Sequence, residues 1–403
     1  MRALLIADDL TGAADSAAAF ASLSAPVRIV PAGSVSNSAL DEAIDHANTT
    51  DGVLVIETDT RDERGEEAAS RLRQAVSRQG LLLHSGWTFK KIDSMLRGPI
   101  AAETGVLHDA GFAERVVCAP ALPARGRFTI GGTQLLGTQP VHSAAGADPR
   151  TGPRSSVVAQ TVGLVPPRDG VTVYDARTDA DLDAVIARLP DPPHDPTLLL
   201  IGTAGLAAAL ARRLRTGAPA PTGSARSQDA ACGPILLISL SPNPVARGQV
   251  EQVLARWPPA VRIVLTPDTS PTDRAAQVEA LDRAHADGSP LAVLTVDTSG
   301  SRHHDADALR AAIMSSVHGV LAHINPWPRI IANGGDACRC VVDTRVDPTL
   351  EVQEPAAEGA VRCWLRSDYG QPQELITKSG GFGDHNTLVD IIETMTPDLR
   401  VAG

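Results

Sequence analysis

Three segments in the first half of the chain place acidic and basic side chains directly after apolar runs that predict β-strands. They are DDLTGAAD from Asp8 to Asp15, TDTR from Thr58 to Arg61, and KKIDSMLRG from Lys90 to Gly98. Ligands of open α/β sheets bind at the carboxyl ends of strands, so these segments could share one edge of a sheet. Arg and Lys can bind a carboxylate there, while Asp and Ser can bind hydroxyl groups or accept a proton. The segments therefore predict a site for a polyhydroxylated carboxylate.

The same segments also have purely structural interpretations, which the residues alone leave open. Asp and Thr are good helix N-caps, and Gly12 permits a turn, so the first segment could simply begin a helix. Arg61 could be a solvated side chain that opens the polar run RDERGEE. KKIDSMLRG could be a salt-bridged turn between a strand and a helix.

Glycine-rich junctions between predicted strands and helices mark the second half of the chain. They are NGGDA from Asn333 to Ala337 and KSGGFGD from Lys378 to Asp384, and SLSPNP from Ser239 to Pro244 is a third candidate. Backbone N–H groups and a helix dipole can hold a phosphate at such a junction. Two of them in one domain predict a polyphosphate site, although the chain has neither a P-loop motif nor a dinucleotide fingerprint after a strand.

A long stretch from Leu122 to Pro167 is rich in Gly, Pro, Ser and Thr and predicts an irregular loop. It contains PARGRFTIGG, in which two arginines flank Gly126. Loops of this length inside a compact domain are usually functional, and this one suits a position near an anion.

Apolar runs alternate with amphipathic segments, which predicts an α/β protein of two domains, each a mainly parallel sheet flanked by helices. The strands are expected at Ala3–Ala7, Gly52–Glu57, Phe89–Ile92, Val116–Ala119, Thr172–Tyr174, Thr197–Ile201, Ile235–Leu240, Val261–Leu265, Leu291–Val296, Arg329–Ala332 and Glu374–Thr377. Helices are expected between them, for example at Glu66–Arg78, Asp179–Leu189 and Asp305–His323. The Ala-, Pro-, Gly- and Ser-rich stretch from Thr216 to Pro234 predicts a linker and a boundary near residue 225. GTAGLAAAL, from Gly202 to Leu210, predicts a small-residue helix packed closely on the sheet.

Composition narrows the class of protein. The 403 residues carry a formal net charge of −11 with no basic tract, which argues against a nucleic-acid partner. The five cysteines are scattered, and Cys338 and Cys340 lack a second pair at zinc-ligand spacing, so we expect neither a disulfide framework nor a bound structural metal. No signal peptide or membrane-length apolar run is evident, so a cytoplasmic location without a membrane partner is expected.

Taken in order, these motifs resemble those of the four-carbon acid sugar kinase family. The resemblance spans nearly the whole chain through ADDLTGAAD, TDTR, KKIDSMLRG, PARGRFTIGG, GTAGLA, SLS, NGGDA and KSGGFGD. It implies an ATP-dependent kinase of a small sugar acid, with Mg²⁺ accompanying the ATP. It also implies that residues 1–225 bind the acceptor and residues 226–403 bind the nucleotide.

Site residues follow from the resemblance position by position. The implied acceptor-binding residues, with their motif neighbours, are Asp8, Asp9, Arg61, Lys91, Ile92, Asp93, Ser94 and Arg97. The implied nucleotide-binding residues, with Ser241 as a competing alignment for Ser239, are Ser239, Ser241, Gly334, Gly335, Asp336, Ala337, Lys378, Gly380 and Gly381. The chain departs from the family pattern mostly by losing hydroxyl groups, at Met95, Ala337 and Pro244, and Gln249 stands about two places late.

These assignments define a mechanism and its alternatives. Arg61 and Lys91 would hold the acceptor's carboxylate, and Asp9, or else Asp93, would accept the proton of the reacting hydroxyl. The acceptor could instead be another oxo or branched sugar acid. From other classes, a nicotinamide-dependent (NAD) sugar-acid dehydrogenase is disfavoured by the missing fingerprint, and a non-catalytic sugar-acid-binding protein is suggested by the lost hydroxyls. The sequence leaves a homo-oligomer open.

Overall fold

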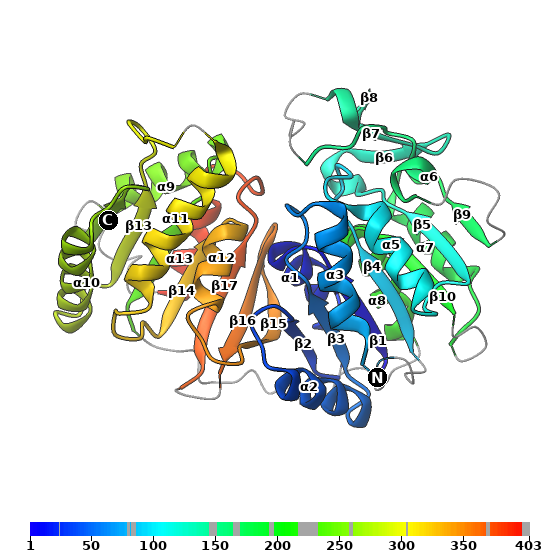
Figure 1. Cartoon of the computed structure of the whole chain (residues 1–403), viewed down its shortest axis with the longest axis horizontal. Coiled ribbons are helices and arrows are strands. Elements are labelled where there is room, and N and C mark those ends of the chain that lie inside the picture. Colours follow the sequence, from blue (N-terminus) through cyan, green and yellow to red (C-terminus); the bar gives the residue numbers. More distant parts are fainter. Residues whose placement is uncertain are drawn as a thin grey trace. The chain divides into compact units, whose positions relative to one another are not determined.

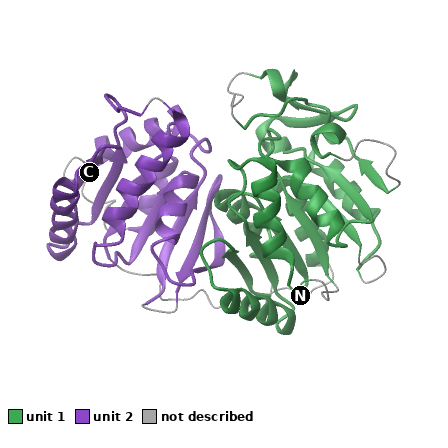
Figure 2. Ribbon diagram, viewed as in Figure 1, with its two compact units in different colours: residues 1–224 green, residues 225–403 purple. Residues whose placement is uncertain are grey.

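The chain forms two compact units, Met1–Ser224 and Ala225–Gly403 (Figure 2). The computed structural model describes residues 1–23, 25–78, 81, 86–144, 151–163, 170–192, 197–216, 233–257, 261–303, 305–367 and 371–396. Most of the predicted linker, with Cys232 inside it, lies outside these residues.

The first unit is built on a parallel sheet with the strand order β2-β3-β1-β4-β10-β5-β9 (Figure 1). Its strands are β1 (Ala3–Ala7), β2 (Val27–Pro31), β3 (Val53–Glu57), β4 (Trp87–Lys91), β5 (Arg115–Ala119), β9 (Val171–Val173) and β10 (Leu198–Gly202). Its helices are α1 (Leu10–Ala18), α2 (Asn37–Thr49), α3 (Gly65–Val76), α5 (Ile100–Asp109), α6 (Val158–Thr161), α7 (Asp179–Ala187) and α8 (Ala204–Thr216). The central strands β1, β3, β4 and β10 are buried along their whole length, as expected of parallel strands covered by helices on both faces.

The helix α8 packs closely on the first sheet, as GTAGLAAAL predicts. A Cβ atom on Gly202 would lie 2.8 Å from Cβ of Leu206 and 2.9 Å from the carbonyl oxygen of Ala119. Only glycine leaves room for so close a contact between the strand end and the helix.

The second unit has a sheet with the order β12-β13-β11-β14-β17-β16-β15. Its strands are β11 (Ile235–Ser239), β12 (Val261–Leu265), β13 (Leu291–Val296), β14 (Arg329–Asn333), β15 (Thr349–Ala357), β16 (Ala360–Arg366) and β17 (Gln373–Lys378). Its helices are α9 (Pro244–Arg256), α10 (Pro271–Ala286), α11 (Ala306–Leu321), α12 (Gly335–Val342) and α13 (Thr387–Met395). The neighbouring strands β12, β13, β11, β14 and β17 pair in parallel. The strand β16 pairs antiparallel with β17 on one side and with β15 on the other. The predicted fold class, two mainly parallel α/β domains, is therefore confirmed.

Three parts of the fold differ from the expectation. The stretch predicted to be irregular, Leu122 to Pro167, contains a small antiparallel sheet of β6 (Arg127–Ile130), β7 (Thr133–Leu136) and β8 (Gln139–Pro140), flanked by the 3-10 turns η1 (Pro123–Arg125) and η2 (Val141–Ser143). The strand β2 was missed, as were β15 and β16. Proline at the end of β2 and inside β15 argues against a strand in a single sequence.

Two further features of the described residues concern membrane-spanning helices and metal-binding groups. Among the described residues, no helix is long and apolar enough to cross a membrane. The same residues contain no group of three or more His, Cys, Asp or Glu side chains that could hold a metal ion.

Candidate functional site

Six charged side chains gather where β1, β3 and β4 end, and we call them the strand-end cluster. Its members are Asp8, Asp9, Arg61, Lys91, Asp93 and Arg97. The strand β1 lies between the other two, with Ala7 paired to Glu57 on one side and to Lys91 on the other. Because the three strands are parallel and in register, their carboxyl ends meet at one edge of the sheet. The three motifs that carry the first-half prediction are thus brought together.

Arg61 is the central cation of the strand-end cluster. Its Nε and Nη2 atoms donate to the two oxygens of Asp8 at 2.9 and 2.8 Å, and Nη2 lies 2.6 Å from Oδ1 of Asp9. Burial alone would raise the pKa of Asp8, but the attraction of Arg61 and Lys90 outweighs it and lowers that pKa. Nη1 of Arg61 makes no hydrogen bond within the described residues, and its nearest carboxylate oxygen, on Asp93, is 3.8 Å away. That edge of the guanidinium is available to a ligand.

Asp9 combines the two roles that the sequence left as alternatives. It is the N-cap of α1: Gly12 N–H donates to its Oδ1 at 3.1 Å. The same carboxylate belongs to the strand-end cluster through Arg61. Its Oδ2 accepts a hydrogen bond from Thr11 Oγ1 at 2.6 Å and has no other partner among the described residues.

Asp93 is held more tightly than Asp9. Arg97 grips both of its oxygens at 2.9 and 2.8 Å, and the N–H of Met95 donates to Oδ2 at 2.9 Å. The turn that makes this possible places Leu96 at a φ of 59°. Burial favours the protonated form, but Arg97 and then Arg61 lower the pKa of Asp93 far below its usual range. Asp93 is therefore a weak base.

Lys91 differs from the other cations of the cluster because it has no partner. The residue is 6% exposed, yet it makes no hydrogen bond or ion pair within the described residues. A Cβ atom on Gly12 would lie 2.6 Å from Lys91 Nζ, so the missing side chain at Gly12 makes room for the ammonium group beside the start of α1. The charge of Lys91 is felt by Asp8 and Asp93, whose pKa values it helps to lower, but its ammonium group has no hydrogen-bond acceptor within the described residues. An anionic ligand would supply one.

Two predicted acceptor residues do not place their side chains in the cluster's hydrogen-bond network. Ile92 belongs to the apolar core, and its N–H donates to the carbonyl oxygen of Gly202. Ser94 contributes its carbonyl oxygen, which accepts a hydrogen bond from Nε2 of Gln134 at 3.0 Å. Any part that Ile92 and Ser94 play in binding would fall to their backbone or, for Ser94, to its half-buried hydroxyl.

A fully buried ion pair lies beneath the cluster. Nζ of Lys90 is 3.0 Å from Oε2 of Glu103, and both side chains are 0% exposed. Thr60 Oγ1 donates to Oε1 of Glu103 at 2.6 Å, while Thr60 N–H donates to the carbonyl oxygen of Asp8. The pair therefore supports the backbone that carries Asp8 and Arg61. Glu103 was not singled out in the sequence, whereas Lys90 was counted with Lys91 in KKIDSMLRG. Adjacent residues of a strand point to opposite faces, so the two lysines have different surroundings.

Replacing Thr60 by Val is expected to lower the free energy of unfolding by about 1.5–3 kcal/mol, because the hydroxyl donates to a charged acceptor. Thr104→Val in α5 is the matched control: its buried hydroxyl donates to the neutral carbonyl oxygen of Ile100, so its loss should cost about 0.5–1.5 kcal/mol. Urea unfolding of both variants measures the difference. Equal losses would show that Glu103 draws no special support from Thr60.

In the second unit, three strand-to-helix junctions converge on Ser241. Gly334 has a φ of 107°, and a Cβ atom there would lie 3.1 Å from Cβ of Ser241. A Cβ atom on Gly380 would lie 2.7 Å from the same Ser241 atom. A Cβ atom on Gly381 would approach Asn243 Nδ2 to 3.1 Å. Glycine is thus required where these turns meet, and together they form a backbone-lined surface that we call the glycine turns.

A buried polar chain links the bases of the glycine turns. Asn333 Nδ2 donates to Oγ of Ser239 at 3.0 Å, and Asn333 Oδ1 accepts from Nζ of Lys378 at 3.3 Å. Lys378, which is 0% exposed, also donates to the carbonyl oxygens of Ser379 at 3.1 Å and Phe382 at 2.9 Å. Lys378 therefore shapes the loop after β17 and places a positive charge beneath it. Of the two competing serines, Ser239 belongs to this buried chain and Ser241 lies between the turns.

The helix α12 begins at one of the glycine turns. Gly334 is its N-cap, and a Cβ atom on Gly335 would meet nothing within 4 Å. Asp336 in the first turn is held by Arg310, whose Nη2 donates to Oδ1 at 2.7 Å, and Ala337 is fully buried. The Cβ side of Gly335 thus faces open space at the start of the helix, where unpaired backbone N–H groups suit an anion.

Gln249 in α9 fixes the loop after β17 from the other side. It is 0% exposed, and its Nε2 donates to the carbonyl oxygens of Phe382 at 3.1 Å and Asp384 at 2.6 Å. Although Gln249 stands about two places later than in the family pattern, its side chain still contacts the loop of the glycine turns.

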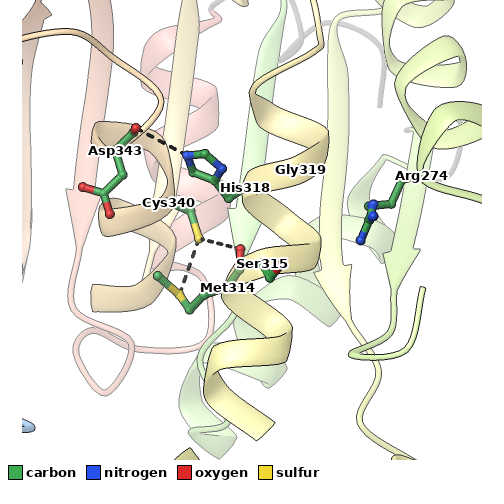
Figure 3. A pocket seen from close by; sticks show the side chains of 7 residues that line it. All are labelled: Arg274, Met314, Ser315, His318, Gly319, Cys340 and Asp343. Atoms are coloured by element: carbon green, nitrogen blue, oxygen red, sulfur yellow. Dashed lines mark hydrogen bonds between the residues drawn. The ribbon is translucent and has the colours of Figure 1, made fainter. Parts of the chain in front are cut away.

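The second unit also carries a surface pocket of about 420 Å³ among α10, α11 and α12 (Figure 3). Its lining residues are Arg274, Met314, Ser315, His318, Gly319, Cys340 and Asp343. Cys340 Sγ lies 3.5 Å from Met314 Sδ, and His318 Nε2 lies 3.4 Å from the carbonyl oxygen of Asp343. None of the predicted site residues lines it.

Comparison with known proteins decides the family. Residues 3–165 match the model of the sugar-binding N-terminal domain, and residues 236–388 match that of the nucleotide-binding C-terminal domain. The chain belongs to the four-carbon acid sugar kinase family. The D-threonate kinase of Bordetella bronchiseptica is 26% identical, covering 96% of this chain and 95% of the relative. That of Cupriavidus necator is 28% identical and covers 98% of both.

A solved structure of a Salmonella typhimurium protein, described as a tRNA synthase, shares the fold of this sugar-acid kinase family member. The TM-score is 0.72 at 19% identity, over 96% of this chain and 98% of that one. At this identity the likeness concerns the fold alone. Membership of the family explains why the motifs occur in this order. The structural roles of Lys90, Glu103 and Gln134 follow only from their buried contacts in the structure.

Proposed function

We propose that this chain transfers a phosphoryl group from ATP to a hydroxyl of a small sugar acid, with a four-carbon acid as the first candidate. The observation that carries the proposal is the presence of two different strand-end sites in a chain of this family. One is a charged cluster with an unpartnered lysine, and the other is a set of glycine turns. The first suits a hydroxylated carboxylate and the second suits a polyphosphate.

The first unit would bind the acceptor, as proposed for residues 1–225. Lys91 and the open Nη1 edge of Arg61 are donors of the strand-end cluster that a carboxylate could reach without displacing a protein partner. Asp8 would hold Arg61 in place rather than contact the acceptor, since its two oxygens are both bound by that guanidinium. The relatives named D-threonate kinase support a four-carbon acid.

Asp9 is the preferred general base. A base must have a free lone pair within hydrogen-bond reach of the hydroxyl proton and a pKa that is not too low. Asp9 Oδ2 has only Thr11 as a partner, whereas Asp93 is gripped by Arg97 and has a strongly lowered pKa. The geometry thus favours Asp9 over Asp93 for this role.

The second unit, residues 226–403, would bind ATP along the glycine turns. The residues present fit a polyphosphate: backbone N–H groups at the start of α12, open space at Gly335, and the buried charge of Lys378 beneath the loop. Mg²⁺ commonly binds through substrate phosphates and keeps several waters, so it would arrive with the nucleotide. It would neutralise phosphate charge during transfer.

The decisive experiment is an ADP-release screen with purified protein, ATP and Mg²⁺ against four- and five-carbon sugar acids, including D-threonate. At least one acid should give ADP release that depends on the acid. Nicotinamide absorbance, followed in parallel with NAD, should not change, since a change would indicate the dehydrogenase alternative. If the folded protein binds sugar acids but releases no ADP with any of them, it is a binding protein and the kinase proposal is wrong.

A further inference from the structure

The β6–β7 hairpin is fastened to the loop that carries Asp93. Gln134 in β7 is 0% exposed, and its Nε2 donates to the carbonyl oxygens of Ser94 and Pro120, both at 3.0 Å. Its Oε1 accepts from Thr129 Oγ1 at 2.7 Å, and Thr129 is its direct cross-strand neighbour. One buried amide thus fixes the hairpin against the strand-end cluster.

Arg127 lies on the face of the hairpin that meets this loop. It stands two residues before Thr129 in β6, and side chains two apart in a strand point to the same face. Its cross-strand partner Leu136 packs against the core of the first unit, which gives the same direction. Burial and the nearby charges of Arg125 and Arg97 lower the pKa of Arg127, while the nearby charge of Asp93 opposes them. Arg127 therefore lies within electrostatic reach of the cluster.

The guanidinium group of Arg127 is only partly paired with protein groups. Its Nη1 donates to the carbonyl oxygen of Arg125 at 3.1 Å, but its Nε is buried without an acceptor, and it forms no ion pair within the described residues. A donor without a protein acceptor, next to the charged side chains of the strand-end cluster, is free to donate to a ligand that binds there.

The charge balance of the strand-end cluster leads to the same conclusion. Its carboxylates are taken by its own arginines: Asp8 and Asp9 by Arg61, and Asp93 by Arg97. With Lys91 as the third cation, the cluster has as many positive as negative charges and is neutral by itself. Arg127 is an additional cation beside it. The region therefore carries an excess of positive charge that a monoanionic ligand would neutralise.

We propose that Arg127 is a specificity-determining residue of the acceptor site: it donates to the acceptor's carboxylate together with Lys91 and Arg61, and so makes a negative charge on the acceptor a requirement. This inference rests on the proposed sugar-acid kinase function. A hydroxylated molecule of the same length without the carboxylate, such as a four-carbon sugar alcohol, would leave the donors of Arg127 unpaired and would be rejected.

The test compares the wild-type chain with Arg127→Met and Arg127→Lys. Loss of a hydrogen bond to a charged group predicts that Arg127→Met raises the KM of the sugar acid about ten- to a hundredfold. The KM of ATP should stay unchanged, and the preference for the acid over the matching sugar alcohol should fall by the same factor. Arg127→Lys should recover part of that preference, because it keeps the charge. Arg188→Met, an exposed arginine in the same unit, is the control and should behave as wild type.

Two outcomes would overturn the inference while leaving the kinase function intact. One is an unchanged acid-to-alcohol preference in a folded and active Arg127→Met variant. The other is an equal loss toward both acceptors and toward ATP, which would mean that Arg127 only supports the fold of the hairpin. If the wild-type chain phosphorylates no acid, the kinase function itself has failed. In that case, calorimetry can still test the role of Arg127, by comparing the affinity of the wild-type chain and of Arg127→Met for D-threonate. A weaker affinity of the variant would support the inference, and an equal affinity would contradict it.

Discussion

Replacing Asp9 by Asn is expected to lower the turnover number of the proposed phosphoryl transfer by about a hundredfold or more, with ATP binding intact. The amide keeps the shape of the side chain but cannot accept the hydroxyl proton. Asn is as good an N-cap as Asp, so α1 should stay in place. Arg61 also remains fixed, because Asp8 grips it through two hydrogen bonds that do not involve Asp9.

Asp93→Asn is the matched comparison in the same cluster. Its carboxylate is committed to Arg97 and to backbone N–H groups, so its replacement should raise the KM of the acceptor more than it lowers turnover. Steady-state kinetics of both variants, with acceptor and ATP varied separately, measure this contrast. A turnover number for Asp9→Asn close to wild type would exclude Asp9 as the base and assign that role to Asp93.

The meeting of the three charged motifs at one edge of the sheet could be predicted because it depends on local patterns. Each of the three motifs follows a continuous apolar run, and parallel strands bring their carboxyl ends to one edge. The pairing within the site could not be predicted in the same way. Whether Arg61 binds a ligand or Asp8 is decided by a contact between residues 53 positions apart, which no local period encodes.

The parts of the fold that were missed are those with weak local signals. The strands of the β6–β7 hairpin have only four residues each and are partly exposed, and Gln134, its anchor, has its partners on other segments. Pro355 interrupts β15, and a proline within a run argues against a strand. The structure accommodates it with register shifts on both sides, between Val352 and Glu354 and between Pro355 and Ala357.

The two serines of the SLS segment show a different limit. Both alignments were compatible with the sequence, since Ser239 and Ser241 are two residues apart and equally polar. The strand β11 ends at Ser239, so the backbone turns between them. Ser239 is tied to Asn333, whereas Ser241 is the residue that both Gly334 and Gly380 approach. The position of the turn after β11 therefore decides that the hydroxyl of Ser239 is buried and structural, whereas that of Ser241 lies where the glycine turns meet.

Replacing Gly335 by Val is expected to abolish ATP binding while leaving the stability of the chain nearly unchanged. A Cβ atom at Gly335 would meet no protein atom within 4 Å, and its backbone is not in the left-handed region, so the fold can accept the side chain. The intrinsic cost of Val in a helix is only about half a kcal/mol relative to Ala. The added methyl groups would instead fill the space above the first N–H groups of α12, where a phosphate would approach.

Gly380→Val should lose ATP binding for a less specific reason. Its Cβ atom would lie 2.7 Å from Cβ of Ser241, so the loop itself must move and stability should fall as well. Gly33→Val in the first unit is the control for Gly335→Val, because its Cβ atom also meets nothing within 4 Å and it lies far along the sequence from the glycine turns. Isothermal titration with ATP and thermal unfolding of the three variants separate the two effects. Full ATP affinity in a folded Gly335→Val variant would show that the start of α12 does not hold a phosphate, even if Gly380→Val had lost binding, because only the first substitution leaves the surrounding protein in place.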